Sequence, residues 1–496
     1  MNIIKTIEEL ETDIVVIGGG GSGMIAAVAA AENGAKNIIV LEKAARPGGN
    51  ANLALGIFAV ESPTQLRLGI KSSRDQVFKD AMEAAKWTTN PRVVRAYVNK
   101  TAEIVGWLER KGLKFVVQGK DSGPGHPPLC HGFSERQGRY ASKTPAKFGE
   151  NHGMVGGTVI ELMIENCKKY GIKVLTKTKA DKITKDSKGR VSGVLASTED
   201  REYKISAKSV IVAAGDFGGN QDMMQKYFNL NIYGDVYRHQ RPGMTGDGIC
   251  MAVDAGAAAD ENPAIHWFGP CHHKWSGSIH CAMKRPDMLW VNKNGERFMD
   301  ESAGDSVQAL RRQPAQICYA IVDSKTLRDI KANPPSPNAE LDEIHVFDTL
   351  YEDLEKEAAE GKVTWVADTL DGFNKVFEAK QEVMKATVEC YNSFCKKAHD
   401  EDFAKDPNYL RPISTPPFYT ILGIIGYGYT SGGIKINERM EVLNPDGEII
   451  SGLYATGNNA GDWVTSNYPQ GGTSLTFAFC SGYIAGENAA KLIWEK

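Results

Sequence analysis

The 496-residue chain lacks the cysteine patterns that bind metals or attach haem. Its 9 cysteines are scattered, and no two of them form a Cys-x-x-Cys pair. Zinc sites, iron–sulfur clusters and attached haem depend on such close spacing, so we expect no metal site. An odd cysteine count also argues against a disulfide framework. We therefore expect reduced thiols and a cytoplasmic protein.

The chain also lacks a charge excess and a clear membrane segment. Its 58 lysines and arginines face 61 acidic residues, a net charge of -3, which predicts no nucleic-acid partner. Residues 1–12 are rich in charge and have no apolar core of the kind found in secretory signals. Residues 14–31 carry no charge, but their glycines favour a strand that turns into a helix. We therefore expect no membrane span.

What the sequence does have, near its start, is the pattern of a nucleotide site. An apolar strand over residues 14–17 leads into a glycine-rich turn, a small-residue helix over 23–33 and a second strand over 38–41. Glu42 closes that second strand, where its carboxylate would accept hydrogen bonds from an adenosine ribose. This βαβ arrangement predicts a Rossmann-like domain that binds the ADP half of a dinucleotide.

Three glycines of the turn carry this prediction. Gly18, Gly20 and Gly23 match G-x-G-x-x-G. In that pattern the glycines allow a tight turn, a close approach of the pyrophosphate and tight packing of helix on strand, while the helix N-terminus faces the anion. Residues 48–50, Gly-Gly-Asn, come too early for a nicotinamide enzyme, but lie where a flavin protein passes its backbone beside the pyrophosphate and ribityl chain. FAD is therefore the expected cofactor.

The rest of the chain suggests one domain interrupted by another. The expected elements are a helical stretch over 75–111, a loop over 119–149, a helix over 158–170, strands over 173–177, 191–195 and 209–213, and a second glycine turn over 213–220. Apolar residues from Phe373 to Cys395 recur at helical spacing, which predicts a long helix with a core face. We expect a nucleotide-binding domain formed by residues 1–257 and 418–496, and a second domain formed by residues 258–417.

Five segments together carry a more specific pattern. They are Glu42-Lys-x-x-x-Pro-Gly-Gly-Asn50, Ala213-Ala-Gly-Asp-Phe-Gly-Gly-Asn220, Thr245-Gly-Asp-Gly-Ile-Cys-Met-Ala-x-x-Ala-Gly256, Asn294-Gly-Glu-Arg-Phe298 and Gly452-Leu-Tyr-Ala-Thr-Gly457. Jointly they resemble the fumarate reductase/succinate dehydrogenase flavoprotein family. The resemblance implies an α/β fold of the glutathione-reductase-like flavoproteins, in which an inserted α+β capping domain interrupts the Rossmann-like FAD-binding domain. It also implies hydride transfer between flavin N5 and a carbon next to an activating group.

The same resemblance implies how FAD is held. Some members attach FAD covalently through an early histidine, but no histidine precedes His126, so non-covalent FAD is expected. The helix that begins at Gly471-Gly472 would point its N-terminus at flavin N1 and C2=O, where reduced flavin carries negative charge. The expected cofactor contacts are Gly18, Gly20, Gly21, Ser22, Gly23, Glu42, Lys43, Gly48, Gly49, Asn50, Ala180, Ala214, Gly215, Asp247, Gly457, Asn458, Thr473, Ser474 and Leu475.

Three positions depart from the fumarate reductases. Asp305 stands where those enzymes have the arginine that donates a proton, and Tyr429 where a histidine binds a substrate carboxylate. Pro469 stands where the family has an arginine before Leu-Gly-Gly. Without these cations a dicarboxylate would be poorly paired, so we expect neither fumarate nor succinate as the substrate.

Tyr468-Pro-Gln-Gly-Gly-Thr473 instead resembles the 3-ketosteroid dehydrogenase branch. In that branch a tyrosine hydroxyl and a glycine N–H hold the substrate carbonyl oxygen. The motif is one residue shorter here, so the glycine is either Gly471 or Gly472. Stabilising the developing enolate eases the exchange of hydride and proton at the α and β carbons, so the expected substrate is an enone or its saturated ketone.

A proton donor or acceptor is still needed for the second carbon. Tyr429 and Tyr427 are the candidates, with Lys284 and Arg285 nearby by family alignment. His266 aligns loosely with a histidine that contacts the substrate.

Two other interpretations stay open. The chain could be the flavoprotein subunit of a larger fumarate reductase-like complex that reduces an unsaturated carboxylic acid. It could also be a non-catalytic binding protein, although its nucleotide loop is intact from Gly18 to Gly23. Only one dinucleotide fingerprint is present, so reduction by NAD(P)H would need a transient second site or a separate redox partner.

Overall fold

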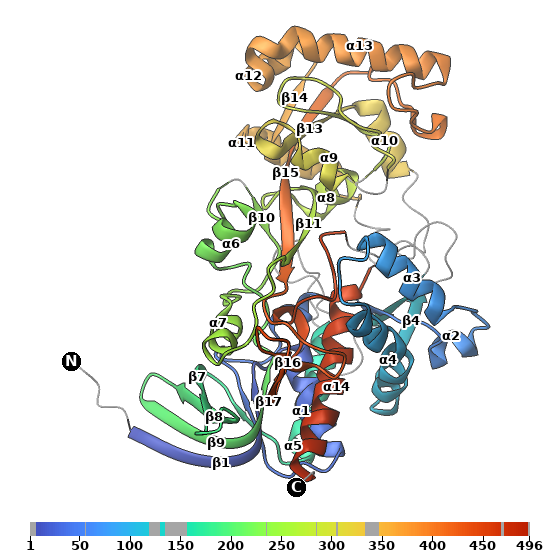
Figure 1. Ribbon diagram of the computed structural model, residues 1–496. Coiled ribbons are helices and arrows are strands. Elements are labelled where there is room, and N and C mark those ends of the chain that lie inside the picture. The colour runs from blue at the N-terminus through green and yellow to red at the C-terminus, as the bar shows by residue number, and fades with distance from the viewer. Residues whose placement is uncertain are drawn as a thin grey trace.

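The structure is a computed structural model (Figure 1), and it describes residues 6–54, 56–118, 129–133, 156–234, 236–283, 285–303, 306–332, 347–467 and 471–494. An eight-stranded sheet forms its base, with the order β16-β17-β9-β1-β2-β6 and with β8 and β7 extending from β9. Its strands are β1 (Thr6–Ile17), β2 (Ile38–Leu41), β6 (Lys173–Leu175), β7 (Lys179–Lys185), β8 (Val191–Ser197), β9 (Arg201–Val212), β16 (Glu441–Leu443) and β17 (Ile449–Ala455). The central pairs from β17 to β6 are all parallel.

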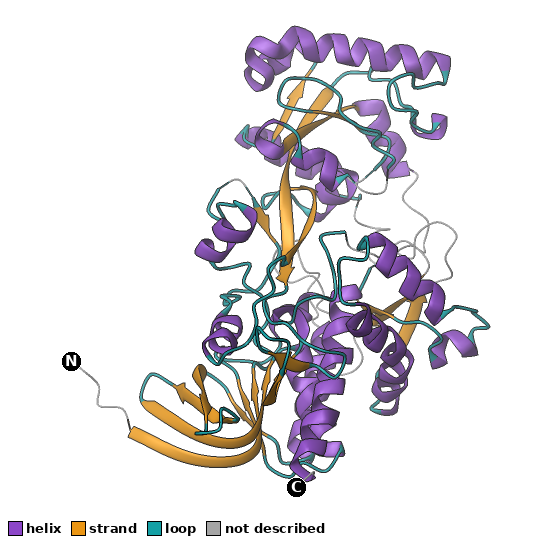
Figure 2. Cartoon of the chain, in the orientation of Figure 1, coloured by secondary structure: helices purple, strands orange, loops and turns teal. Residues whose placement is uncertain are grey.

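Helices cover this parallel sheet because its strands are apolar on both faces. Helix α1 (Gly21–Glu32) packs against α14 (Thr473–Trp494) and α5 (Gly156–Lys169), and Figure 2 shows α1 and α14 side by side. Two glycines of α14 allow this close approach. A Cβ at Gly482 would lie 2.3 Å from the carbonyl oxygen of Ser22, and one at Gly486 would lie 2.4 Å from that of Ala26.

A second, six-stranded sheet is built around the long strand β15 (Phe418–Ser431), which rises from the base in Figure 1. β15 pairs with β10 (Tyr237–Arg238), β11 (Ala264–Cys271), β13 (Ile317–Asp323) and β14 (Thr364–Ala367), and β13 pairs with β12 (Leu289–Val291). The helices of this part are α8 (Gly277–Met283), α9 (Val307–Arg311), α10 (Ser324–Ala332), α11 (Leu350–Glu360), α12 (Asn374–Phe377) and α13 (Gln381–Lys397).

The remaining elements lie beside the base. A three-stranded sheet has the order β3-β5-β4, formed by β3 (Gly56–Phe58), β4 (Phe115–Gln118) and β5 (Cys130–Phe133). The remaining helices are α2 (Pro63–Arg67), α3 (Arg74–Ala84), α4 (Pro91–Arg110), α6 (Gln221–Phe228) and α7 (Asp247–Asp254). Within the described residues, no helix is both long and apolar enough to cross a membrane.

The architecture agrees with the expected α/β class and its inserted α+β unit. The first βαβ unit is confirmed as β1, α1 and β2. The expected domain boundaries stay a prediction. Strand pairing joins β10 and β15 in one sheet, although residues 237–238 precede the expected insertion and residues 418–431 follow it.

Two local expectations were wrong, and a third was right in its helical character but missed a break. The helical stretch over 75–111 divides into α3 and α4, because Lys86 and Trp87 take positive φ angles of 51° and 58° between them. The loop expected over 119–149 contains β5, and the other residues of that range lie outside the described part of the chain. The long helix from Phe373 is broken at Glu378, whose φ is 44°, so α12 and α13 are separate. The expected core role of the apolar residues in this segment is confirmed, since Phe373, Phe377 and Met384 are buried.

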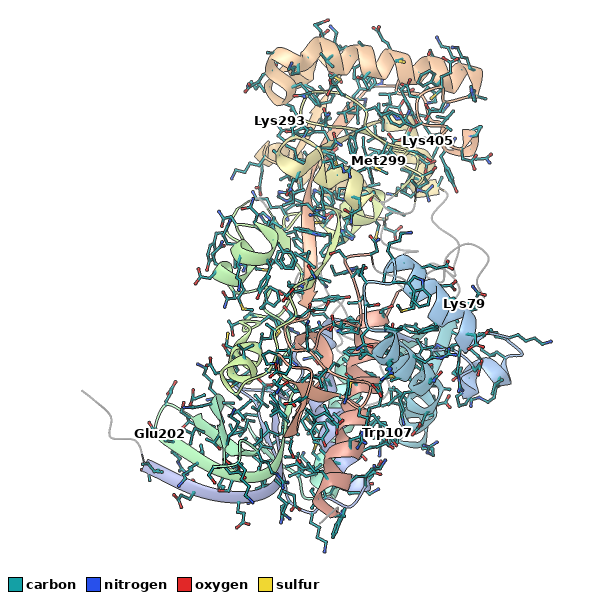
Figure 3. All side chains as sticks on the ribbon, in the orientation of Figure 1. Lys79, Trp107, Glu202, Lys293, Met299 and Lys405 are labelled. Atoms are coloured by element: carbon teal, nitrogen blue, oxygen red, sulfur yellow. The ribbon has the colours of Figure 1, made fainter. Side chains whose placement is uncertain are left out.

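Charged side chains from the segments that follow β12 and α13 are buried together. Arg297 Nη2 lies 2.9 Å from Glu301 Oε2 and 2.8 Å from Asp400 Oδ2. Lys405 Nζ lies 3.1 Å from the same Glu301 oxygen, and the side chains of Glu301, Asp400 and Lys405 are 0% exposed. Figure 3 places Lys405 among the side chains below α13. The two cations and the two anions sum to zero charge, so removing one of them would leave another buried charge without a partner.

The substitution Glu301→Gln should lower the free energy of unfolding by about 3–5 kcal/mol, because it leaves the buried Lys405 ammonium without its carboxylate. Urea unfolding of the FAD-loaded protein measures this loss. Glu389→Gln, on the exposed side of α13, is the matched control and should change stability by less than about 0.5 kcal/mol. Equal losses in the two variants would contradict this account of the ion cluster.

Candidate active site

The turn after β1 forms a backbone cradle at the start of α1. Gly18 has a φ of 107°, and a Cβ there would lie 2.3 Å from the carbonyl oxygen of Ala213. A Cβ on Gly20 would meet only Gly48 O, at 3.8 Å, so the backbone there is open. The first turn of α1 has no acidic residue, and no side chain caps it. The backbone N–H groups at the start of α1 fit the pyrophosphate of a dinucleotide.

Glu42 is held in place at the end of β2. Its Oε2 accepts a hydrogen bond from Gly19 N at 2.8 Å, and its Oε1 accepts one from Ala44 N at 2.7 Å. The next residue, Lys43, pairs with Asp247 at 2.7 Å and donates to Thr245 Oγ1 at 2.7 Å. The pair joins β2 to the start of α7.

Asp216 is a residue of the candidate site that the sequence reasoning did not single out. Its carboxylate is 1% exposed and accepts hydrogen bonds from Asn50 Nδ2 at 3.0 Å and from Gly218 N at 2.8 Å. Burial raises the pKa of this carboxyl to about 6, against the hydrogen bonds from Gly218 and Asn458, which lower it. Asp216 thus joins the glycine segments around Asn50, Gly218 and Asn458. Its place between Gly215 and Phe217, inside a glycine turn, was the available signal.

Strand β15 is anchored on the same turn. Phe217 N donates to Thr430 Oγ1 at 3.1 Å, and the Tyr427 hydroxyl donates to Gly218 O at 2.6 Å. Gly432 N donates to Asn458 O at 3.1 Å. The last residues of β15 therefore adjoin the expected cofactor contacts.

Two of the other predicted cofactor residues, Gly215 and Gly457, lie in contact with these turns. Gly457 has a φ of 65°, and a Cβ there would lie 2.7 Å from Ser22 Oγ. Gly215 N donates to Asn459 Oδ1 at 3.2 Å, next to Asn458. Ala180 lies in β7, and Ala214 follows β9.

Helix α14 begins beside β3. Gly472 has a φ of 84°, and a Cβ there would lie 2.7 Å from Phe58 N, so this position requires glycine. Thr476 N donates to Gly472 O at 2.9 Å, which makes Gly472 the residue before the helix. Ser474 Oγ donates to Asn458 Oδ1 at 2.9 Å. The start of α14, with Gly471, Thr473, Ser474 and Leu475, is thereby tied to the glycine turn after β17.

Two candidates for contact with the substrate lie together. His266 of β11 is the direct partner of Tyr429 of β15, and their rings stack with centroids 5.0 Å apart and planes 24° apart. Burial lowers the pKa of His266 to about 4, so its imidazole is neutral at physiological pH.

Two other candidates have protein partners. Tyr427 is 0% exposed and its hydroxyl donates to the backbone at Gly218, which suits a residue that holds the turn in place. Burial also raises the pKa of Tyr427 well above its ordinary value. Arg285 donates to Asp287 Oδ2 from Nε at 3.0 Å and from Nη2 at 2.7 Å.

Several residues of the sequence argument cannot be placed. Lys284 and Tyr468 lie outside the described residues, as do Asp305 and Pro469. Their roles stay predictions from the sequence.

Comparison with known proteins identifies the family. The family model described as FAD binding domain matches residues 13–475 of the chain. The chain is 29% identical to a vinyl phenol reductase of Lactiplantibacillus plantarum, over 97% of this chain and 96% of that protein. It is 27% identical to a fumarate reductase (cytochrome) of Shewanella frigidimarina, over 97% of this chain and 77% of that protein.

A solved structure shows the same fold. The 3-ketosteroid-Δ4-(5α)-dehydrogenase of Rhodococcus jostii RHA1 superposes with a TM-score of 0.74 at 22% identity, over 97% of each chain. Both branches named from the sequence motifs are therefore represented among its relatives and structural neighbours. With a family match over most of its length, the chain belongs to the FAD binding domain family, and FAD is its cofactor.

Proposed function

We propose that the protein is an FAD-dependent oxidoreductase of CH–CH bonds whose substrate is activated by an uncharged group, such as a ketone. The pairing of Tyr429 with a neutral His266 carries this proposal. The related fumarate reductases would have cations at Tyr429, Asp305 and Pro469. A dicarboxylate brought to this site would lose its hydration without gaining a countercharge.

Each group in the site has a separate role in the proposed reaction. Bound FAD supplies the ring that exchanges hydride with the substrate. The N-terminus of α14 would stabilise negative charge on that ring, and Tyr468 with the N–H of Gly471 or Gly472 would polarise the substrate oxygen. Tyr429 would exchange the proton at the second carbon.

The electron source and location are parts of the same proposal. With one dinucleotide fingerprint in the chain, we assign the supply or removal of electrons to a separate redox partner. The Shewanella fumarate reductase extends beyond the matched part, since the chain covers 77% of it. Every described cysteine outside β5 is a free thiol, which favours the cytoplasm.

Anaerobic photoreduction of the FAD-loaded protein tests the function. A neutral enone should reoxidise the reduced flavin quickly, whereas fumarate should do so at least about a hundredfold more slowly, because its carboxylates lack partners in the site. The flavin absorbance reports both reactions. Rapid reoxidation by fumarate alone would favour the alternative, a fumarate reductase-like subunit acting on unsaturated acids.

Tyr468→Phe should lower the turnover with a neutral enone by about two to three orders of magnitude, because it removes a hydrogen bond to the developing enolate. FAD content should stay at the wild-type level. Tyr409→Phe, in an exposed turn, serves as the control. Wild-type turnover in Tyr468→Phe would remove this residue from the mechanism.

We also propose that FAD is bound without a covalent bond. Acid precipitation should then leave all of the FAD in the supernatant, because only hydrogen bonds and packing hold it. Absorbance of the supernatant and of the redissolved pellet measures the division. A yellow pellet would contradict non-covalent binding.

A further inference from the structure

Aromatic rings gather at the end of β15 that adjoins the cofactor turns. Tyr237 and His239 stack with centroids 6.2 Å apart, and Phe268 meets them edge-on at 5.8 Å and 6.0 Å. His266 and Tyr429 form the second stack, at 5.0 Å. We call these five residues of β10, β11, β15 and the segment after β10 the aromatic wall. Each of the five is partly exposed, so the wall is not a closed core.

Gly428 connects the two halves of the wall. A Cβ at this position would lie 3.7 Å from Phe268 Cε1 and 3.8 Å from His266 Cδ2. The glycine thus leaves the surface between the two groups of rings free of a side chain. Thr430, the residue after Tyr429, accepts the hydrogen bond from Phe217, so the wall adjoins the turn that holds Asp216.

Two titratable side chains of the wall, His266 and Tyr237, are uncharged. The pKa of His266 is lowered to about 4 by burial, and burial raises the pKa of the Tyr237 hydroxyl, so both are neutral at physiological pH. Arg238 lies between two wall residues in sequence, but its guanidinium is 6.0 Å from the ring centroid of Tyr233 and interacts with the Tyr427 hydroxyl, and both of these tyrosines lie outside the wall. Arg311 lies over the ring of Trp267, a residue outside the wall, at 4.6 Å.

Resting on the function proposed above, we propose that the substrate carries a planar, uncharged aromatic ring conjugated with its double bond, and that this ring packs against His266, Tyr429 and Phe268. Partly exposed rings gain buried apolar area and favourable ring contacts when a second ring covers them. Reduction adds one hydride and one proton across the double bond, and reduced FAD gives up the two electrons. An aryl ring in conjugation lies in the plane of the reacting carbons, so the wall would also orient them.

A matched pair of enones tests whether the substrate carries an aromatic ring. Benzylideneacetone and 3-penten-2-one share the enone and differ in a phenyl or methyl group at the β carbon. Photoreduced holoenzyme should be reoxidised by the aryl enone with a kcat/KM about tenfold higher or more, since roughly 1.4 kcal/mol of added packing corresponds to a factor of ten. Equal values would overturn the ring assignment and leave the proposed function intact.

Variants of the wall sharpen the test. His266→Leu and Phe268→Leu keep apolar volume but remove a ring, so the preference for the aryl enone should fall severalfold, mainly through KM. Tyr409→Leu, in an exposed turn, should keep the wild-type preference. FAD content, read from absorbance, identifies a variant that fails to fold, in which case the other variant decides. A preference unchanged in a folded wall variant would contradict the proposal.

A ligand-binding measurement tests the aromatic-ring proposal independently of the proposed function. Oxidised holoenzyme should bind 4-phenylbutan-2-one more tightly than 2-pentanone, measured by perturbation of the flavin spectrum. If neither enone reoxidises the flavin, the proposed function fails, and the two ketones still decide about the ring. Equal dissociation constants for the two ketones would then overturn the ring assignment.

Discussion

The buried carboxylate of Asp216 is the contact on which the arrangement of the site depends. Folding brings segments more than a hundred residues apart to this side chain, since Asn50 and Gly218 donate to it and Asn458 contributes a further hydrogen bond. An isolated buried charge would be costly, and these hydrogen bonds compensate for its lost hydration. The same turn receives β15 through Thr430 and Tyr427, so one short segment positions both the cofactor cradle and the strand that carries Tyr429.

The protein deals with buried charge differently in two parts of the region around the six-stranded sheet. After β12 and α13, Arg297, Glu301, Asp400 and Lys405 neutralise one another and need no ligand. Near the cofactor turns, the neutral His266 stacks on Tyr429, and this pair offers no countercharge to a carboxylate. This contrast supports an uncharged substrate at the end of β15 more directly than any single residue does.

The local structure of the candidate cofactor site could be predicted from the sequence because it depends on local patterns. The strand, turn and helix around Gly18, Gly20 and Gly23 follow from spacing alone, and Glu42 follows from its place at the end of β2. Asp216 could not be found in this way, because its role depends on Asn50, which is 166 residues away. Tyr427 and Tyr429 look alike in the sequence. Only the pairing of β15 with β11 and the turn at Gly218 distinguishes the hydroxyl that donates to Gly218 from the ring beside His266. The break at Glu378 was missed because apolar spacing continues across it, while a positive φ interrupts the backbone.

A crystal structure of the FAD-loaded protein with a saturated aryl ketone tests the central claim most directly, namely that the flavin and an uncharged substrate meet where the Asp216 turn joins β15. The account predicts the isoalloxazine ring between the start of α14 and Tyr429, with the Asn50–Asp216 hydrogen bond intact and the ketone on the same side as His266. An isoalloxazine ring bound elsewhere, or a ligand held by a cluster of cations in place of these rings, would contradict it.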